Sequence, residues 1–289
     1  MDPKEIKALK KLAADIRIET LFSIASFGSG HVGGCMSIAD TLAVLYGAVL
    51  EYDAENPNWE KRDRVVMSKG HCGPALYATL ALSGFFPLDW LKTLNRPGTR
   101  LPSHCDRLKT PGIDVSTGSL GQGVSLSCGL ALALKMRKSK SMVYAIVGDG
   151  ELQEGEVWEA FLFANAKQLS NLVFLIDRNH MQLDGFTEDI TPIEPLKEKL
   201  QSFGLKVFET DGNDVDAIYQ VLSPLKSEHS GPYAVILDTI KGGGYYLAEE
   251  AEKCHHMAVT FENALQGKKE ILHRLENDLR VCGDKRYDR

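Results

Sequence analysis

The chain has 289 residues, of which 44% are hydrophobic and 25% are charged, and its formal net charge is −6. This is an ordinary globular composition, and without a basic cluster it argues against binding to nucleic acid through phosphate neutralisation. No apolar run approaches the roughly 18 residues of a membrane helix, so no membrane contact is expected. The first twenty residues mix charges into a helical pattern and do not form a signal peptide. Six scattered cysteines without a CxxC pair favour reduced thiols and a cytoplasmic location.

Apolar spacing predicts helices and strands that alternate along the chain. Helices are expected at residues 4–26, 36–50, 73–83, 121–136, 153–168, 193–203, 214–226 and 260–280. Short apolar runs bounded by turn residues predict buried strands at 64–68, 142–149, 172–179, 206–210 and 234–240. This alternation predicts an α/β fold, with an open parallel sheet flanked by helices. No repeat or long linker interrupts the pattern, so we expect residues 1–289 to form a single domain.

The stretch FGSGHVGG holds the pattern Gly28-x-Gly30-x-x-Gly33, which is typical of dinucleotide-binding loops, and Asp53 follows at a suitable distance. That fingerprint must follow a strand and open a helix within a βαβ unit. Here a long amphipathic helix leads into the glycines, so we do not expect NAD to bind. The informative residue of this turn is His31, a bulky polar side chain with no packing purpose between two helices.

A second glycine-rich turn, Gly148-Asp149-Gly150, follows a predicted strand and precedes a helix. Glycines there let the backbone approach a phosphate, and the amides at a helix start favour an anion. Asp149 would repel that anion unless a cation lay between them, which indicates Mg²⁺. Asn179 ends the next predicted strand, with 28 residues between it and Gly150, and would reach the same edge of the sheet.

Gly-Asp-Gly followed by nearly thirty residues and Asn resembles the motif of thiamine-diphosphate enzymes. The segments 56–71, 101–123, 148–160 and 239–245 further resemble those of transketolases, in the same order, and the similarity covers nearly all of residues 10–260. The resemblance implies the thiamine-diphosphate-binding fold, specifically its pyrophosphate-binding module. It also implies a reaction in which a two-carbon ketol unit passes from a ketose phosphate donor to an aldose phosphate acceptor.

The resemblance implies a metal site and a cofactor site. Asp149, Asn179 and the carbonyl of Met181 match the ligands of Mg²⁺, with Ca²⁺ or Mn²⁺ able to substitute. Gly150 and His71 match pyrophosphate contacts. Further cofactor contacts are implied by loop and helix-start residues, including two leucines that hold the cofactor bent and a glutamate at the subunit interface; the set is His71, Ser119, Leu120, Gly121, Gly148, Asp149, Gly150, Glu151, Glu154, Asn179, Leu183 and Lys241.

Three histidines match the catalytic residues of the family. His31 and His255 would serve proton transfers, and His104 would hold the C1 hydroxyl of the donor. His255 is chosen by register, and His256 is the alternative, because this chain has two adjacent histidines where the family shows His-Gly. Val32 also stands where proline is usual, which affects the loop geometry while keeping the imidazole of His31.

No segment after residue 260 resembles the pyrimidine-binding and C-terminal domains of a transketolase. We therefore expect the N-terminal subunit of a split transketolase, active only with a separate C-terminal subunit, with two copies of each chain and the cofactor across their boundary. One alternative is a split transketolase for a sulfo- or branched sugar. Another is a different thiamine-diphosphate synthase, such as deoxyxylulose-phosphate synthase. A catalytically idle scaffold would have lost the histidines or the metal ligands, and both sets are present.

Overall fold

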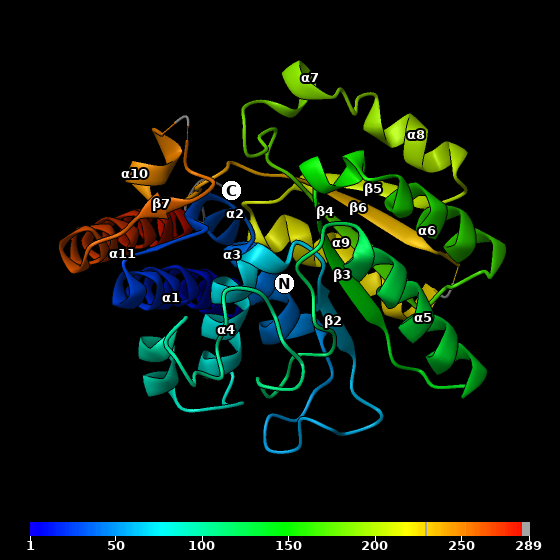
Figure 1. The fold of residues 1–289 in the computed structure, drawn as a ribbon, viewed down its shortest axis with the longest axis horizontal. Helices are drawn as coiled ribbons and strands as arrows, with labels where there is room; N and C mark the ends of the chain where they lie inside the picture. Colours follow the sequence, from blue (N-terminus) through cyan, green and yellow to red (C-terminus); the bar gives the residue numbers. More distant parts are fainter. Residues whose placement is uncertain (229, 252, 285–289) are drawn as a thin grey trace.

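A parallel sheet lies at the centre of the computed structural model, which describes residues 1–228, 230–251 and 253–284 (Figure 1). Its strands are β2 (Arg64–Met67), β3 (Val143–Gly148), β4 (Leu172–Arg178), β5 (Lys206–Asp211) and β6 (Tyr233–Asp238). They lie in the order β2-β3-β4-β6-β5, and every neighbouring pair is parallel. Each strand falls within two residues of a predicted run, which confirms the open parallel sheet.

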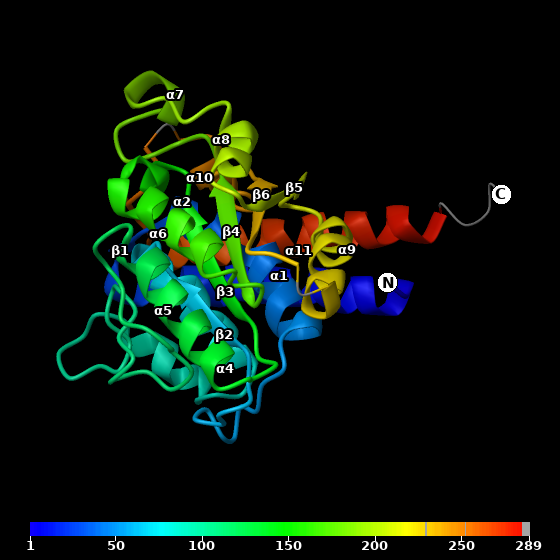
Figure 2. The ribbon, with the colours of Figure 1, turned by 90° about the vertical axis from the view of Figure 1, so that its right-hand side faces the viewer.

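Helices cover both faces of the sheet, as the side view in Figure 2 shows. One face carries α5 (Gln122–Met136), α6 (Gly155–Ala166) and α8 (Leu196–Ser202). The other carries α1 (Pro3–Phe27), α3 (Ala39–Val44), α4 (Gly73–Leu82), α9 (Val215–Glu228) and α11 (Phe261–Asp284). Alternate residues of β3 belong to two separate apolar clusters, with Val143, Ala145 and Val147 in one and Tyr144 and Ile146 in the other. The central strands β3, β4 and β6 are largely apolar because both of their faces are buried, whereas the edge strand β5 is partly exposed and carries charged residues.

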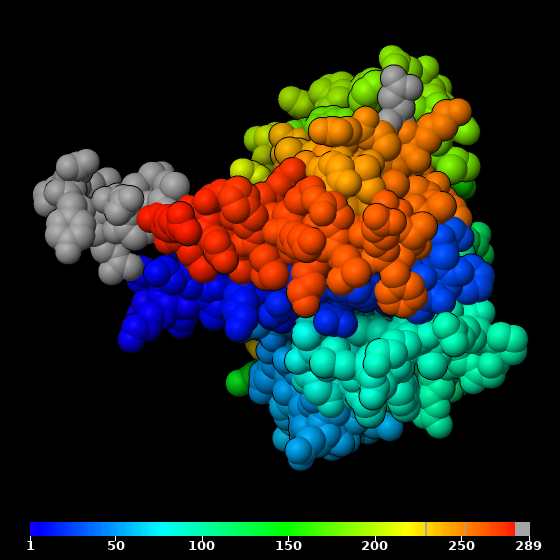
Figure 3. All heavy atoms as spheres, turned by 90° about the vertical axis from the view of Figure 1, so that its left-hand side faces the viewer, coloured from blue at the N-terminus to red at the C-terminus, as the bar shows by residue number. Residues whose placement is uncertain are grey.

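The long helix α1 begins and ends at residues suited to those positions. Asp2 accepts a hydrogen bond from the N–H of Lys4, Glu5 accepts one from the N–H of Asp2, and Pro3 occupies the first turn. Gly28 ends the helix in the left-handed region, at a φ of 104°. Helix α11 lies against α1 along its length (Figure 3). Within the described ranges, no helix is both long and apolar enough to cross a bilayer.

The region predicted as one helix at 36–50 is divided, and that prediction is wrong. Helix α2 (Val32–Ser37) starts earlier, α3 follows it, and a π-helical turn spans Leu45–Val49. Gly33 and Gly34 lie in α2 and pack so closely on other segments that no side chain fits there. A Cβ on Gly33 would lie 2.8 Å from the carbonyl oxygen of Cys254, and one on Gly34 would lie 2.8 Å from Cys72 Sγ. Such tertiary contacts leave no mark on local apolar spacing.

Several short elements had no counterpart in the sequence pattern. They are the helices α7 (Thr187–Ile190) and α10 (Tyr246–Glu249), the 3-10 turns Gly70–Cys72, Leu88–Thr93 and Gly150–Gln153, and the strands β1 (Ser29–Gly30) and β7 (Met257–Ala258). The two strands pair antiparallel, with Gly30 opposite Met257. This pairing brings the turn that carries His31 beside the segment that carries His255 and His256.

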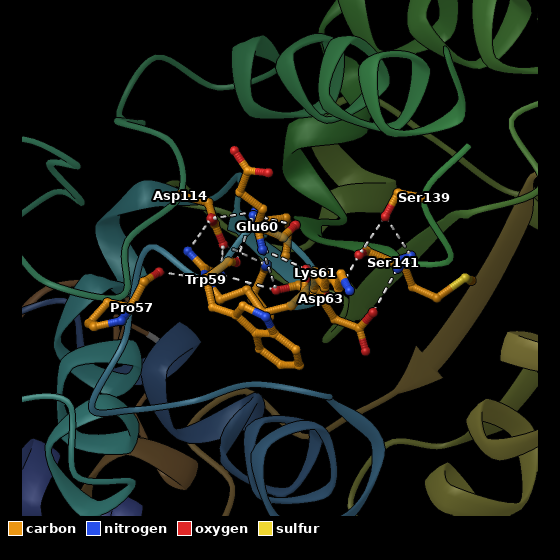
Figure 4. A network of polar contacts seen from close by, with 12 residues as sticks. Pro57, Trp59, Glu60, Lys61, Asp63, Asp114, Ser139 and Ser141 are labelled. Carbon is orange, nitrogen blue, oxygen red and sulfur yellow. Dashed lines mark hydrogen bonds and ion pairs between the residues drawn. The ribbon is translucent and has the colours of Figure 1, made fainter. Parts of the chain in front are cut away.

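A polar network ties together the amino ends of β2 and β3, at the edge opposite the strands' carboxyl ends (Figure 4). Asp63 accepts a hydrogen bond from the backbone N–H of Met142 at 2.7 Å. Asp114 accepts one from Arg62 Nη2 at 2.6 Å and another from the N–H of Val65 at 3.0 Å. Asp63 thus connects the residue before β3 to the start of β2, whereas Asp114 holds the first residues of β2 in place.

Candidate active site

Asp149 is a buried acid at the carboxyl end of β3. The strand register pairs Gly148 with Asp177 of β4, so the ends of the two strands lie side by side. Asp149 Oδ1 accepts a hydrogen bond from the N–H of Gly150 at 2.8 Å. Its Oδ2 is buried and has no hydrogen-bond partner among the described residues. Burial raises the pKa of Asp149 to about 6, and the nearby charge of Asp177 contributes to this rise. A cation beside Oδ2 would relieve both effects.

Asn179 and Met181 follow β4 and line the same cavity as Asp149. Asn179 Nδ2 donates to Asp177 Oδ2 at 2.7 Å, and Asn179 Oδ1 accepts from the N–H of Met181 at 3.2 Å. The carbonyl of Met181 accepts a hydrogen bond from Lys241 Nζ at 2.7 Å. A carbonyl oxygen has a second lone pair, so this contact leaves Met181 able to accept a second partner.

These groups line one cavity of about 310 Å³. Most of the predicted cofactor and metal residues line it, and four residues join them that were not predicted: Gly34, Lys69, Gln153 and Gln182. The predicted residues among its lining are His71, Leu120, Gly148, Asp149, Gly150, Glu151, Glu154, Asn179, Met181, Leu183, Lys241 and His255. Two predicted cofactor residues, Ser119 and Gly121, and two predicted catalytic residues, His31 and His104, are not part of the lining.

The donor set of this cavity fits a magnesium ion and a pyrophosphate. A carboxylate, an amide oxygen and a backbone carbonyl are the oxygen ligands that Mg²⁺ takes. A Cβ on Gly150 would come within 3.0 Å of the Gln182 side chain, so glycine leaves the backbone room for close approach. Lys241 adds a positive charge, and burial lowers the pKa of its ammonium. Among the described residues, Asp149 Oδ2 is a buried carboxylate oxygen without a hydrogen-bond partner, and it belongs to the residue that would hold the metal.

Five histidines form a cluster at the cavity. The ring centroid of His31 lies 5.1 Å from that of His71, 5.9 Å from His104, 5.3 Å from His255 and 4.9 Å from His256. His71 and His255 are 4.9 Å apart and both line the cavity. The structure thus brings together all the predicted histidines, from four separate segments. Among the residues described, no three His, Cys, Asp or Glu side chains are arranged to hold a metal ion.

The histidine cluster disfavours protonation. Burial lowers the pKa of His31 to about 4 and that of His255 to about 3, and the neighbouring His71 contributes to both shifts. Burial and His71 also lower the pKa of His104. These imidazoles are therefore neutral near pH 7, so each has one nitrogen that donates and one that accepts. Neutral imidazoles suit hydrogen bonds to sugar hydroxyls and the uptake of a proton from them.

The family model of the thiamine diphosphate binding domain of transketolase matches residues 8–281. The chain belongs to the transketolase family. It is 48% identical to the 6-deoxy-6-sulfo-D-fructose transketolase subunit SqwG of Clostridium sp. (strain MSTE9), over 88% of this chain and 92% of that protein. It is 37% identical to one of the subunits of apulose-4-phosphate transketolase from Phocaeicola vulgatus, over 86% of this chain and 88% of that protein.

Solved transketolase structures share the fold of this transketolase-family chain. The transketolase of Leishmania mexicana superimposes with a TM-score of 0.84 at 29% identity, and the match covers 96% of this chain. It covers 45% of the Leishmania chain, so this chain spans less than half the length of that relative. The family, its thiamine-diphosphate-binding fold and the parallel sheet are those that the sequence motifs predicted.

Some predicted cofactor residues of the transketolase motif lie at the rim of the cavity or behind it. Ser119 and Glu154 are exposed, and Leu183 has 62% of its surface exposed. Glu151 points inward instead, because its Oε1 accepts from Ser68 Oγ at 2.5 Å and its Oε2 accepts from the N–H of Gly148 at 3.0 Å. Glu151 thereby joins the ends of β2 and β3 and supports the loop rather than presenting a free carboxylate.

Two buried charged residues were missed in the sequence. Lys69, which precedes Gly70-His71, donates to Asp177 Oδ2 at 2.5 Å and to the carbonyl of Gly34 at 3.1 Å. Although burial opposes the charge of Lys69, Asp177 raises its pKa. The signal that could have found Asp177 is a charged residue within the apolar run LVFLIDR, since buried strands exclude unpaired charges.

Proposed function

We propose that this chain is the thiamine-diphosphate-binding subunit of a split transketolase, which transfers a two-carbon ketol unit from a ketose to an aldose together with a separate partner chain. One observation carries the proposal. The same cavity contains Asp149 Oδ2, which no described group satisfies, and the imidazoles of His71 and His255. A metal-held pyrophosphate beside a neutral imidazole such as that of His255 is the arrangement this reaction needs. The relatives named as transketolase subunits support the same proposal.

In this proposal Asp149, Asn179 and the carbonyl of Met181 hold Mg²⁺, for which Ca²⁺ or Mn²⁺ can substitute. His71, Lys241 and the backbone of Gly150 bind the pyrophosphate. Leu120 and Leu183 provide apolar surface for the rest of the cofactor. Glu154, Ser119 and Gly121 lie at or near the side that a partner chain would cover, and Glu151 holds the loop in place.

Thiamine diphosphate, when bound, supplies an electron sink for cleavage of the bond between C2 and C3 of the ketose. His104 donates a hydrogen bond that holds the C1 hydroxyl of the donor. His31 and His255 are neutral, so they take and return protons at the hydroxyl and carbonyl oxygens of the sugars. His256 lies within reach of His31 and remains the alternative to His255.

The donor that we propose is a ketose with a sulfonate at its far end. The relative named for 6-deoxy-6-sulfo-D-fructose is 48% identical, whereas those named for apulose 4-phosphate are 37% and 38% identical. Removal of two carbons from a six-carbon sulfoketose leaves a four-carbon sulfonated aldehyde. Apulose 4-phosphate is the second candidate, and sugar phosphates of the pentose phosphate pathway form the wider class.

The partner in this proposal carries the pyrimidine-binding and C-terminal domains, and residues 1–289 form a single pyrophosphate-binding module. Two copies of each chain would place each cofactor at a boundary between unlike chains. The exposed side chain of Leu183 in the lining of the cavity supports a covering chain. A cytoplasmic location remains a prediction from the free, buried thiols, which among the described side chains are Cys35, Cys72, Cys105, Cys128 and Cys254.

The test is to purify the chain alone and with its candidate partner, and to assay ketol transfer with thiamine diphosphate and Mg²⁺. The donors are 6-deoxy-6-sulfo-D-fructose, apulose 4-phosphate and fructose 6-phosphate, with an aldose phosphate as acceptor. Mass spectrometry detects the shortened aldehyde. We expect activity only in the complex, and the highest kcat/KM with the sulfonated donor. Robust transfer by the chain alone would overturn the split arrangement, and a preference for either phosphate donor would overturn the substrate assignment.

A further inference from the structure

Asp177 is the meeting point of four hydrogen-bond donors behind the cavity. It is fully buried near the end of β4. Its Oδ2 accepts from Ser37 Oγ at 2.8 Å, from Lys69 Nζ at 2.5 Å and from Asn179 Nδ2 at 2.7 Å, while its Oδ1 accepts from Thr239 Oγ1 at 2.6 Å. The donors come from α2, from the segment after β2, from the segment after β4 and from the segment after β6. One carboxylate therefore joins four elements.

The hydrogen bond between Asp177 and Asn179 determines whether the oxygen or the nitrogen of the Asn179 amide points away from Asp177. An amide can bind a cation only through its oxygen, because its nitrogen carries two protons. Asp177 is an acceptor, so it holds the Nδ2 end of Asn179 and turns Oδ1 away, toward the N–H of Met181. With the amide reversed, two oxygens would oppose each other at Asp177, and N–H groups would face the metal position.

We propose that Asp177 is a positioning residue for the metal site: it fixes the amide of Asn179 with its oxygen toward the cation, and it does so without touching metal or cofactor. The inference rests on the proposed metal at Asp149 and Asn179. Hydrogen-bonded neighbours of metal ligands orient those ligands in many metalloproteins, and their loss costs about 10- to 100-fold in metal affinity. Here Asp177 would orient the metal ligand Asn179.

A purely structural role, in which Asp177 only neutralises Lys69, predicts something different. Loss of Asp177 would then weaken the whole fold, and no amount of Mg²⁺ would restore cofactor binding selectively. A positioning role predicts a defect confined to metal affinity, because a reoriented amide still allows the site to fill at high Mg²⁺. The two roles are separated by measuring metal affinity and saturated binding in the same titration.

The experiment uses the complex of this chain with its partner and titrates MgCl₂ at a fixed thiamine diphosphate concentration, with binding followed by calorimetry. For Asp177→Asn we expect the apparent Kd of Mg²⁺ to rise about 10- to 100-fold. Thiamine diphosphate affinity at saturating Mg²⁺ should return to within about threefold of wild type. Thr239→Val is the matched control, because it removes a donor from the other oxygen of the same carboxylate and leaves Asn179 held.

Asp177→Asn leaves Lys69 without its counter-charge, so a second comparison is needed where that variant fails to fold. Lys69→Met alone keeps three donors on Asp177, whereas Lys69→Met combined with Asp177→Asn removes both charges. The double variant should have a Kd for Mg²⁺ about tenfold or more above that of Lys69→Met.

Equal Mg²⁺ affinities in these two variants would overturn the positioning role, as would an equal loss in Thr239→Val. If wild-type binding of thiamine diphosphate does not depend on a divalent metal, the proposed metal site itself fails. The titration of the wild type alone shows that outcome, so it is distinguished from failure of the positioning role.

Discussion

Replacement of Asp149 by asparagine is expected to stabilise the metal-free chain at neutral pH while abolishing its response to Mg²⁺. The carboxylate is 2% exposed, and burial together with Asp177 raises its pKa from an ordinary 3.8 to about 6. A folded state that binds a proton more tightly than the unfolded chain is stabilised at low pH. This contribution is present below about pH 4, is lost as the pH rises toward 6, and stays lost above that.

The size of the effect follows from the change in pKa. A rise from 3.8 to about 6 corresponds to about 3 kcal/mol of unfavourable free energy for the ionised acid at pH 7. Asparagine removes the charge and keeps an oxygen that can accept from the N–H of Gly150. The upper limit of the gain is therefore about 3 kcal/mol, or roughly 5 °C in Tm for a chain of this length.

The assay is thermal unfolding of the full chain without metal, wild type against Asp149→Asn, from pH 4 to pH 8. His31 and His255 have lowered pKa values and change stability in the opposite direction, but both variants retain them, so the difference between the two curves isolates Asp149. The Tm of the variant should rise relative to that of the wild type between pH 4 and pH 6. Addition of Mg²⁺ and thiamine diphosphate should then raise the Tm of the wild type only. A variant no more stable than wild type at pH 7.5, or a difference independent of pH, would refute the reasoning.

Three further predictions concern the histidines and the helix α5 that packs on the end of β2. His104→Ala should lower kcat of the complex at least about tenfold, through loss of a hydrogen bond to the donor, and should leave the Kd of thiamine diphosphate unchanged in a direct titration. Because the pKa of His31 is lowered to about 4, the pH–rate profile of the wild type should show no loss from this residue near pH 6.5; His31→Gln cannot take up a proton, so it should lower kcat by about 10²- to 10⁴-fold at neutral pH. Gly123→Ala should destabilise the chain by about 1–3 kcal/mol in urea unfolding, since its Cβ would lie 2.6 Å from Ser68 Cα. Gly129→Ala in the same helix is the control, because its Cβ meets no described atom within 4 Å.

The sheet and most of its helices could be predicted because buried parallel strands are apolar on both faces. An apolar run such as 172–179 can therefore be identified as a strand without knowing which strands lie beside it in the sheet. The region 36–50 could not be predicted, because the helix α2 includes Gly33 and Gly34, whose need for glycine comes from close contacts with Cys254 and Cys72, which lie far away in the sequence. The pairing of β1 with β7 depends on two residues from each strand and leaves no periodic pattern.

The part of the site formed by motif residues could be predicted from spacing, since the carboxyl ends of adjacent parallel strands meet at one edge. Asp149 and Asn179 are two examples. Asp177 and Lys69 could not be predicted from spacing, because a buried charge is explained only when its partners are placed beside it, and here these are each other and, for Asp177, also Asn179. Glu151 lines the cavity, and only the structure shows that its two oxygens accept hydrogen bonds from Ser68 and from backbone N–H groups.

The distribution of donors among three buried carboxylates indicates where a cation belongs. Asp177 accepts from four side chains, one of them the Lys69 ammonium. Glu151 accepts from one hydroxyl and two backbone N–H groups. Within the described part of the chain, Asp149 accepts only from the N–H of Gly150 and keeps a buried oxygen unsatisfied. A site selected only for stability would have supplied a donor there. The missing donor is better explained as the place of a divalent ion, whose charge also makes room for a pyrophosphate beside an acid.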